Sequence, residues 1–193
     1  MKTMLKLSAA VALLAATAAP AFAASVLTVD FNKVFTDSAA AKSGMSQLHA
    51  KYDAQLQQRG TAFQQAAQAF QTLQNQLAAV KAPAVVTPAQ RASYQQAGER
   101  AEAAQNAVNQ LDQEVQTVNR YVQSQILQRV TPIAEQVRNE RKAEVVVPTG
   151  GVLASDPAND VTAVVIQRLD AAFPNPSITL PTQQAAPAQG PGR

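Results

Sequence analysis

A seven-residue rhythm of small and apolar residues runs through the centre of this chain. Its steps alternate between three and four residues from Tyr94 to Val122, which is typical of a helix that packs along one seam against another helix. After Val122 the steps become four and four up to Val130, which indicates a stutter where the seam shifts face. The rhythm occupies Tyr94, Ala97, Ala101, Ala104, Val108, Leu111, Val115, Val118 and Val122, and continues at Ile126, Val130, Ile133 and Val137.

A matching seam precedes this one. It consists of Leu48, Tyr52, Leu56, Arg59, Phe63, Ala66, Phe70, Leu73, Leu77 and Val80. Residues 81–90 separate the two seams, and there Pro83 forces its neighbour out of helical geometry, while Thr87 and Pro88 suit the start of a new helix. We therefore predict an antiparallel helical hairpin over residues 38–142 with its tip at 81–90. Each arm reaches about 60 Å at the helical rise.

Short apolar runs flank the hairpin and predict strands that meet at its base. Residues 25–30 and 144–147 are two such runs, and a third strand is predicted at 152–154 after a turn. The run at 144–147 is nearly continuous in β-branched residues, which predicts burial on both faces. A last helix is expected to begin at Asn159 or Asp160.

These elements predict a small body of residues 24–37 and 143–173, and the fold class is α+β. Asp30 lies where the first short helix needs an N-terminal cap, a role that its carboxylate fits. A body of this size cannot bury its apolar faces alone, so we expect it to self-associate. The residues expected to form the association body are Val26, Leu27, Val29, Phe31, Val145, Val146 and Val147.

The two ends of the chain are predicted to lie outside the folded part. Residues 1–23 combine the positive charges of Lys2 and Lys6 with a short apolar run, as in a secretory signal peptide cleaved after Ala23. The expected destination is the bacterial periplasm. No later apolar run is long enough to cross a membrane, so stable membrane insertion is not expected. Residues 174–193 are rich in Pro, Gln and Ala and are predicted to be disordered.

Charge and reactive residues exclude several classes of function. Removal of Lys2 and Lys6 leaves 14 basic and 13 acidic residues, so nucleic acid is not an expected partner. The chain has no cysteine and one histidine, His49, which without a carboxylate cluster is a poor metal ligand. Ser46, His49 and Asp53 would share one exposed helix without a pocket or an oxyanion hole. We therefore predict no cofactor, no metal and no enzymatic activity.

Three short motifs resemble those of the Skp (OmpH) family of periplasmic chaperones. They are Val29–Phe35 after the first strand, Glu144–Val147 after the hairpin, and Asp160–Thr162 before the last helix, and the resemblance spans residues 25–173. It implies a homotrimer in which three helical hairpins surround a cavity. Such a trimer holds unfolded outer-membrane proteins without ATP and keeps them from aggregating until they reach the outer-membrane assembly machinery.

The arms depart from the basic arms of that family, because they are dominated by Gln and Ala. Near the tip only Lys81, Arg91 and Arg100 are basic, so lipopolysaccharide binding is not carried over to this chain. An alternative function is that of a structural adaptor or spacer of the cell envelope, which would dock through the tip at Pro83–Pro88.

Aromatic residues on or beside the seams are candidates for weak contact with an unfolded client. They are Phe63, Phe70, Tyr94 and Tyr121, and the alternative is that they pack between the two helices. Pro132 lies within the second arm, where it predicts either a simple kink or a hinge that widens the cavity. Gly44 and Gly60 weaken the first arm and predict bends there.

Overall fold

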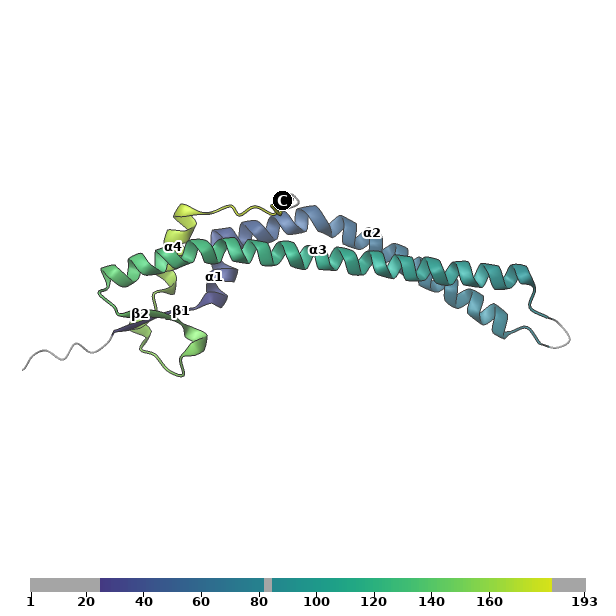
Figure 1. The fold of residues 1–193 in the computed structure, drawn as a ribbon, viewed down its shortest axis with the longest axis horizontal. Coiled ribbons are helices and arrows are strands. Elements are labelled where there is room, and N and C mark those ends of the chain that lie inside the picture. The colour runs from purple at the N-terminus through teal and green to yellow at the C-terminus, as the bar shows by residue number, and fades with distance from the viewer. Residues whose placement is uncertain (1–24, 82–84, 182–193) are drawn as a thin grey trace, which may run out of the picture.

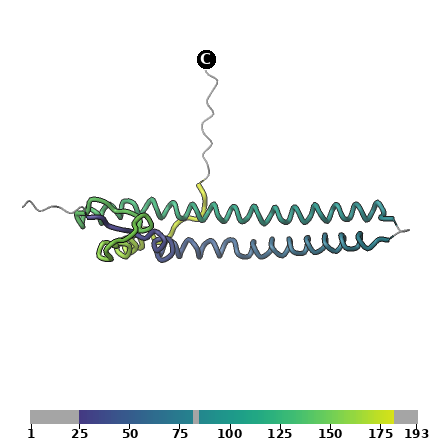
Figure 2. The backbone as a smooth tube through the Cα atoms, turned by 90° about the horizontal axis from the view of Figure 1, so that it is seen from below, coloured from purple at the N-terminus to yellow at the C-terminus, as the bar shows by residue number. Residues whose placement is uncertain are grey.

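The computed structural model describes residues 25–81 and 85–181, which form a long helical hairpin with a small body at its base (Figures 1 and 2). Helix α2 (Ala39–Ala78) is the outgoing arm and helix α3 (Pro88–Glu140) the returning one. Both views show the two helices side by side from base to tip, and the predicted hairpin of packed helices is confirmed. The predicted signal peptide and its cleavage site at Ala23 lie outside the described residues.

Side-chain caps fix where the helices begin. The Asp30 carboxylate accepts hydrogen bonds from the backbone N–H groups of Asn32 and Lys33 at the start of α1 (Phe31–Asp37), as predicted. Thr87 and Gln90 form a reciprocal capping box in front of α3, with Pro88 in its first turn. These bonds satisfy amide groups that have no partner inside the helix. The short capping motifs therefore set the boundaries of the hairpin.

The two predicted seams face each other along the hairpin. Every seam residue of α3 is buried or half-buried, and so is every seam residue of α2. The most deeply buried group on the arms is Leu48, Tyr52, Leu111 and Val118, in the half of the hairpin that is nearer the body. Toward the tip most seam residues are half-buried, among them Phe63, Ala66 and Leu73, although Ala97 is buried. Burial thus decreases from the base to the tip.

The body contains a parallel two-stranded sheet. Strand β1 (Val26–Val29) pairs with β2 (Val145–Pro148) in a register that sets Val26 beside Val145 and Val29 beside Pro148. Parallel neighbours need a long crossover connection, and here the whole helical hairpin lies within that crossover. Helix α4 (Thr162–Ala172) completes the body after two short 3₁₀ turns at 149–151 and 157–159.

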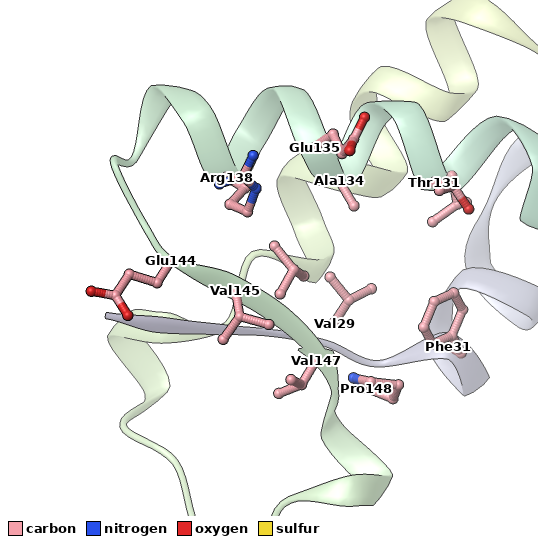
Figure 3. Close-up of a pocket in the computed structure, with 12 residues that line it drawn as sticks. Val29, Phe31, Thr131, Ala134, Glu135, Arg138, Glu144, Val145, Val147 and Pro148 are labelled. Carbon is pink, nitrogen blue, oxygen red and sulfur yellow. The ribbon is translucent and has the colours of Figure 1, made fainter. Parts of the chain in front are cut away.

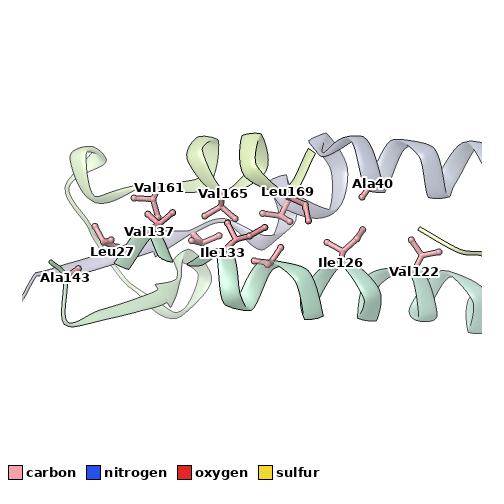
Figure 4. Packing of buried hydrophobic residues seen from close by; sticks show 13 residues of the cluster. Leu27, Ala40, Val122, Ile126, Ile133, Val137, Ala143, Val161, Val165 and Leu169 are labelled. Atoms are coloured by element: carbon pink, nitrogen blue, oxygen red, sulfur yellow. The ribbon is translucent and has the colours of Figure 1, made fainter. Parts of the chain in front are cut away.

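The predicted stutter in α3 marks the point where the arm enters the body. Val122, Ile126, Val130, Ile133 and Val137 are all buried in the body core, most of them against residues from β1, α1 and α4 (Figure 4). The other members of this core are Leu27, Val29, Val34, Ala40, Ala143, Val161, Val165 and Leu169. A seam that served one partner helix along the arm must serve several elements here, which explains its change of spacing.

The third strand predicted at 152–154 is wrong. These residues follow a 3₁₀ turn, have no strand assignment, and expose Leu153 completely. The free side of β1 is instead taken by Asp160, which forms an isolated parallel bridge with Thr28, and the N–H of Val161 donates to the Thr28 carbonyl at 3.0 Å. The predicted burial of both faces of β2 is also wrong, because Val145 is 40% exposed.

The glycines of α2 have different surroundings. Helix α2 is assigned without a break through Gly44 and Gly60. Gly44 is buried, and a Cβ atom at this position would lie 2.7 Å from Cγ1 of Val122. At Gly60 a Cβ atom would meet nothing within 4 Å. Gly44 therefore permits close packing of the two arms, which explains it better than the predicted bend.

This difference predicts opposite effects of alanine at the two glycines. We expect Gly44→Ala to lower the free energy of unfolding by about 1–3 kcal/mol, because Val122 must move to avoid the added methyl group. Gly60→Ala should raise it by up to about 1 kcal/mol, since alanine favours a helix and has free space. Urea unfolding followed by circular dichroism measures both. Equal effects of the two substitutions would contradict the close approach at Gly44.

The segment that follows α4 is ordered at its start. Residues 174–181, which we call the C-terminal segment, were predicted to be disordered, but they lie along the arms (Figures 1 and 2). Pro176 is buried and Ile178 packs against both apolar clusters of the chain. The prediction of disorder was wrong for these residues because amino-acid composition does not predict which single residues will pack against the arms. The rest of the predicted tail, 182–193, lies outside the described residues.

Candidate functional site

The surface of the arms offers few apolar side chains, and the predicted contact aromatics are half-buried. Phe63, Phe70, Tyr94 and Tyr121 are all intermediate in exposure. The rings of Phe70 and Tyr94 stack across the hairpin with their centroids 4.9 Å apart and their planes at 28°. A Cβ at Gly98 would lie 3.3 Å from the Phe70 ring, so the ring lies directly over this glycine. Phe70 and Tyr94 therefore hold the arms together near the tip.

Hydrogen bonds of polar residues also join the arms, and the sequence analysis did not predict these contacts. The Tyr52 hydroxyl donates to Glu114 Oε1 at 2.7 Å, and burial of the ring raises the pKa of Tyr52. Arg59 lies on the predicted seam and donates from Nη1 to the backbone carbonyl of Ala107 at 2.8 Å. The one sequence feature that could have indicated this contact is the charged Arg59 within an otherwise apolar heptad pattern. These bonds connect the two helices across the middle part of the seam.

The body carries an open apolar groove between β2 and α3, which we call the base groove. It has a volume of about 530 Å³ and is lined on the body side by Val29, Phe31, Val145 and Val147 (Figure 3). Thr131, Ala134, Glu135 and Arg138 line it on the α3 side. Within the described residues β2 has β1 as its one strand neighbour, so its other edge carries no ladder partner. Exposed edges of this kind can pair with another chain.

The predicted association residues fall into three groups by exposure. Leu27 and Val29 are 5% and 1% exposed and belong to the core of the chain itself. Val26 and Val145 are 37% and 40% exposed and are neighbours across the two strands. Phe31, Val146 and Val147 are half-buried. The second group therefore offers apolar surface to a partner, whereas the buried pair supports the sheet from within.

Hydrogen bonds tie the start of the hairpin to α4. The Thr162 hydroxyl accepts from the Asp30 N–H at 2.8 Å and donates to the Asp160 carboxylate. Asp160 also accepts from the Thr162 N–H at 2.9 Å, and the side-chain bond from Thr162 lowers the pKa of Asp160 although burial acts against it. Asp170 accepts from the Ala39 N–H at 2.7 Å, at the start of α2. These polar residues fix the direction in which the arms leave the body.

The comparisons with known proteins agree with this arrangement. The sequence profile of the family described as outer membrane protein (OmpH-like) matches residues 25–169. The chain belongs to the OmpH-like family. The match includes β1, the complete hairpin, β2 and most of α4, so family membership rests on both the arms and the body. This is a family of outer membrane chaperones and is typically non-enzymatic.

A solved structure has the same fold. It is the crystal structure of a protein from Caulobacter crescentus designated an OmpH-like outer membrane chaperone. The two sequences are 20% identical, the TM-score is 0.58, and the similarity covers 79% of this chain and 88% of the other. At this identity the likeness shows a shared fold. No match was found among curated proteins.

The family motifs that the sequence displays have structural roles in this OmpH-like chain. Asp30 caps α1, Thr162 bonds to both Asp30 and Asp160, and β2 pairs with β1. Across the ranges that the structure describes, no three His, Cys, Asp or Glu side chains gather as metal ligands, and His49 lies 3.1 Å from Asp53 on an exposed helix face. The same ranges contain no helix that is both long and apolar enough to cross a bilayer.

Asp160, in the last of the three family motifs, predicts a pH dependence of stability. Because the folded chain lowers the pKa of Asp160, the unfolded chain binds a proton there more readily. Its stabilising effect is complete at neutral pH and is lost as the pH falls below about 4. We expect Asp160→Asn to reduce the loss of unfolding free energy between neutral and acidic pH, measured by urea unfolding. Asp112→Asn, at an exposed position of α3, should leave the pH dependence unchanged.

Pro132 lies within α3 without ending it. The helix assignment is continuous from Pro88 to Glu140, with Pro132 inside it. Ile133 beside it is buried in the body core, whereas Pro132 itself is exposed. An exposed face tolerates the proline because the carbonyl that loses its partner can bond to water. Its role as a hinge stays a prediction.

Proposed function

We propose that this chain is an ATP-independent periplasmic holdase that keeps unfolded outer-membrane proteins from aggregating. The observation that carries the proposal is the family match over residues 25–169, which joins the chain to outer membrane chaperones across its arms and its body. A signal peptide ending at Ala23 would deliver it to the periplasm, where such clients pass on their way to the assembly machinery.

The proposed assembly is a homotrimer formed through the bodies. The exposed Val26 and Val145, the unpaired edge of β2 and the base groove together provide the apolar surface that a second copy would cover. An interface of this composition excludes water from valine side chains and satisfies strand backbone groups. Three arms leaving one joint body would enclose a space for a client, and Pro132 is the proposed hinge that lets the space widen.

The proposed holding mechanism uses many weak contacts. An unfolded β-barrel protein exposes alternating apolar residues and unpaired backbone groups, through which it aggregates. The arms offer abundant glutamine side chains for exchangeable hydrogen bonds and the partly exposed rings of Phe63, Phe70, Tyr94 and Tyr121 for shallow apolar contact. Weak, numerous contacts need no ATP for release. Client proteins would leave when a more stable folded state becomes available.

The test combines mass in solution with a holding assay. The mature chain is measured by light scattering alone and after mixing with a urea-unfolded porin that is then diluted. We expect three chain masses, uptake of one porin and suppression of its light scattering. A single chain that leaves the porin to precipitate would reject the holdase and favour the spacer that docks through the hairpin tip.

A further inference from the structure

The C-terminal segment occupies a defined position on the arms. Pro176 is covered on the side of Gly44, where a Cβ atom would lie 3.2 Å from the proline Cγ. Ile178 contacts both the body core and the arm cluster, and Ser43 Oγ donates to Asn175 Oδ1 at 2.8 Å. The absence of a side chain at Gly44 thus makes room for this segment as well as for Val122.

Glutamine side chains from both arms bind the backbone of the segment. The amide of Gln125 donates to the Ser177 carbonyl at 2.8 Å and accepts from the Ser177 N–H at 3.1 Å. From the other arm, Gln47 donates to the Pro176 carbonyl at 3.1 Å. All three groups that the two glutamines bind belong to the backbone of the segment, so these bonds require no particular side chain. A donor and an acceptor offered to one residue are also what a neighbouring β-strand provides.

From Pro176 to Thr179 the side chains of the segment alternate between the arms and solvent. Pro176 is buried and Ile178 half-buried, whereas Ser177 and Thr179 are exposed. Alternation with a period of two is the mark of an extended chain. Strands of outer-membrane barrels alternate apolar and polar residues in the same way. The segment therefore shows, on this chain, how a stretch of an outer-membrane protein could bind.

We propose that Ser43, Gly44, Gln47, Val122 and Gln125 form a binding site, the arm site, for extended client segments with alternating apolar residues. The C-terminal segment occupies this site as an internal competitor. The identity of the client rests on the proposed function. A client binds when the segment is displaced, so its apparent affinity falls with the fraction of chains in which the site is occupied.

The test releases the segment in the full-length mature chain while it leaves the arm site intact. Pro176→Asp combined with Ile178→Asp places charges where the arms cover apolar side chains. The probe is a fluorescent peptide with the sequence of residues 174–181, and binding is followed by anisotropy. We expect the released variant to bind it at least about tenfold more tightly than the unchanged chain does. Leu153→Asp, at a fully exposed leucine, is the matched control and should bind like the unchanged chain.

Two further variants separate site recognition from general loosening of the fold. Gln125→Ala, added to the released variant, should weaken peptide binding about tenfold, while Gln123→Ala at an exposed position of the same helix should not. Ser43→Cys with Asn175→Cys allows a short thiol crosslinker to fix the segment in place, because the chain has no other cysteine. Crosslinking should reduce binding of both the peptide and the unfolded porin.

The outcomes distinguish this inference from the proposed function. If the unchanged chain holds the porin but release and crosslinking alter neither peptide nor porin binding, the arm site is rejected and the holdase stands. If the released variant binds the peptide through Gln125 but no form of the protein prevents porin aggregation, the holdase is rejected and the arm site stands as a peptide site. A released variant that binds the peptide no better than the Leu153→Asp control rejects the internal competitor.

Discussion

Leu169→Ala is expected to destabilise the base of the hairpin more than any other truncation of α4. Leu169 is fully buried in the core that joins α4 to the stutter of α3 and to β1. Removing its side chain costs the transfer of the lost methyl groups and leaves a cavity. We therefore expect the free energy of unfolding to fall by about 2–5 kcal/mol. Urea unfolding followed by far-UV circular dichroism measures the change.

The matched control is Leu153→Ala, because Leu153 is the same residue type at a fully exposed position of the body. Its effect should stay within about 0.5 kcal/mol. Both variants must be compared at one protein concentration, since the proposed association would contribute to the apparent stability. Equal losses at the two leucines would show that α4 does not carry the core of the body.

Lysine at both Val26 and Val145 is expected to abolish self-association. These valines lie next to each other across the two strands and are more than a third exposed, so a single chain should fold with little change. Within an interface between bodies each lysine would lose its water without gaining a partner, which is strongly unfavourable. We expect sedimentation velocity to show one chain mass and the holding assay to lose most of its activity.

Val85→Lys is the control for this double variant. Val85 is 75% exposed and lies in the connection between α2 and α3, at the tip of the hairpin. The same change in charge at this position should leave both the mass and the holding of a porin unaltered. An intact assembly in the Val26 and Val145 variant would place the interface elsewhere on the chain.

Much of the hairpin is predictable from local pattern because its contacts recur along the sequence. The heptad rhythm from Tyr94 to Val122 identified the seam residues, and Thr87 with Gln90 identified the start of α3. Even Arg59, an exception in the rhythm, lies at the seam and bonds across it. Periodicity succeeds where each residue meets the same kind of partner every turn.

The body and the candidate site were less predictable, since their contacts join residues far apart in the chain. Nothing near residues 152–154 indicates that Asp160 occupies the free side of β1. Because this bridge occupies that side, residues 152–154 do not pair there as a third strand. In the sequence, Gly44 looks like a residue that weakens a helix. Only the close approach of Val122 and Pro176 shows that it is a packing position.

The sequence by itself determined the helical hairpin, its capped ends and its membership of a chaperone family, because periodicity, capping residues and short motifs are local properties. Tertiary structure decided which side of each element is covered. It set β2 parallel to β1 with one open edge, turned the stutter of α3 into the body core, and laid the C-terminal segment on the arms. The physical reason is that the burial of a side chain depends on which residues, distant in the sequence, pack around it, and local sequence patterns do not specify those residues.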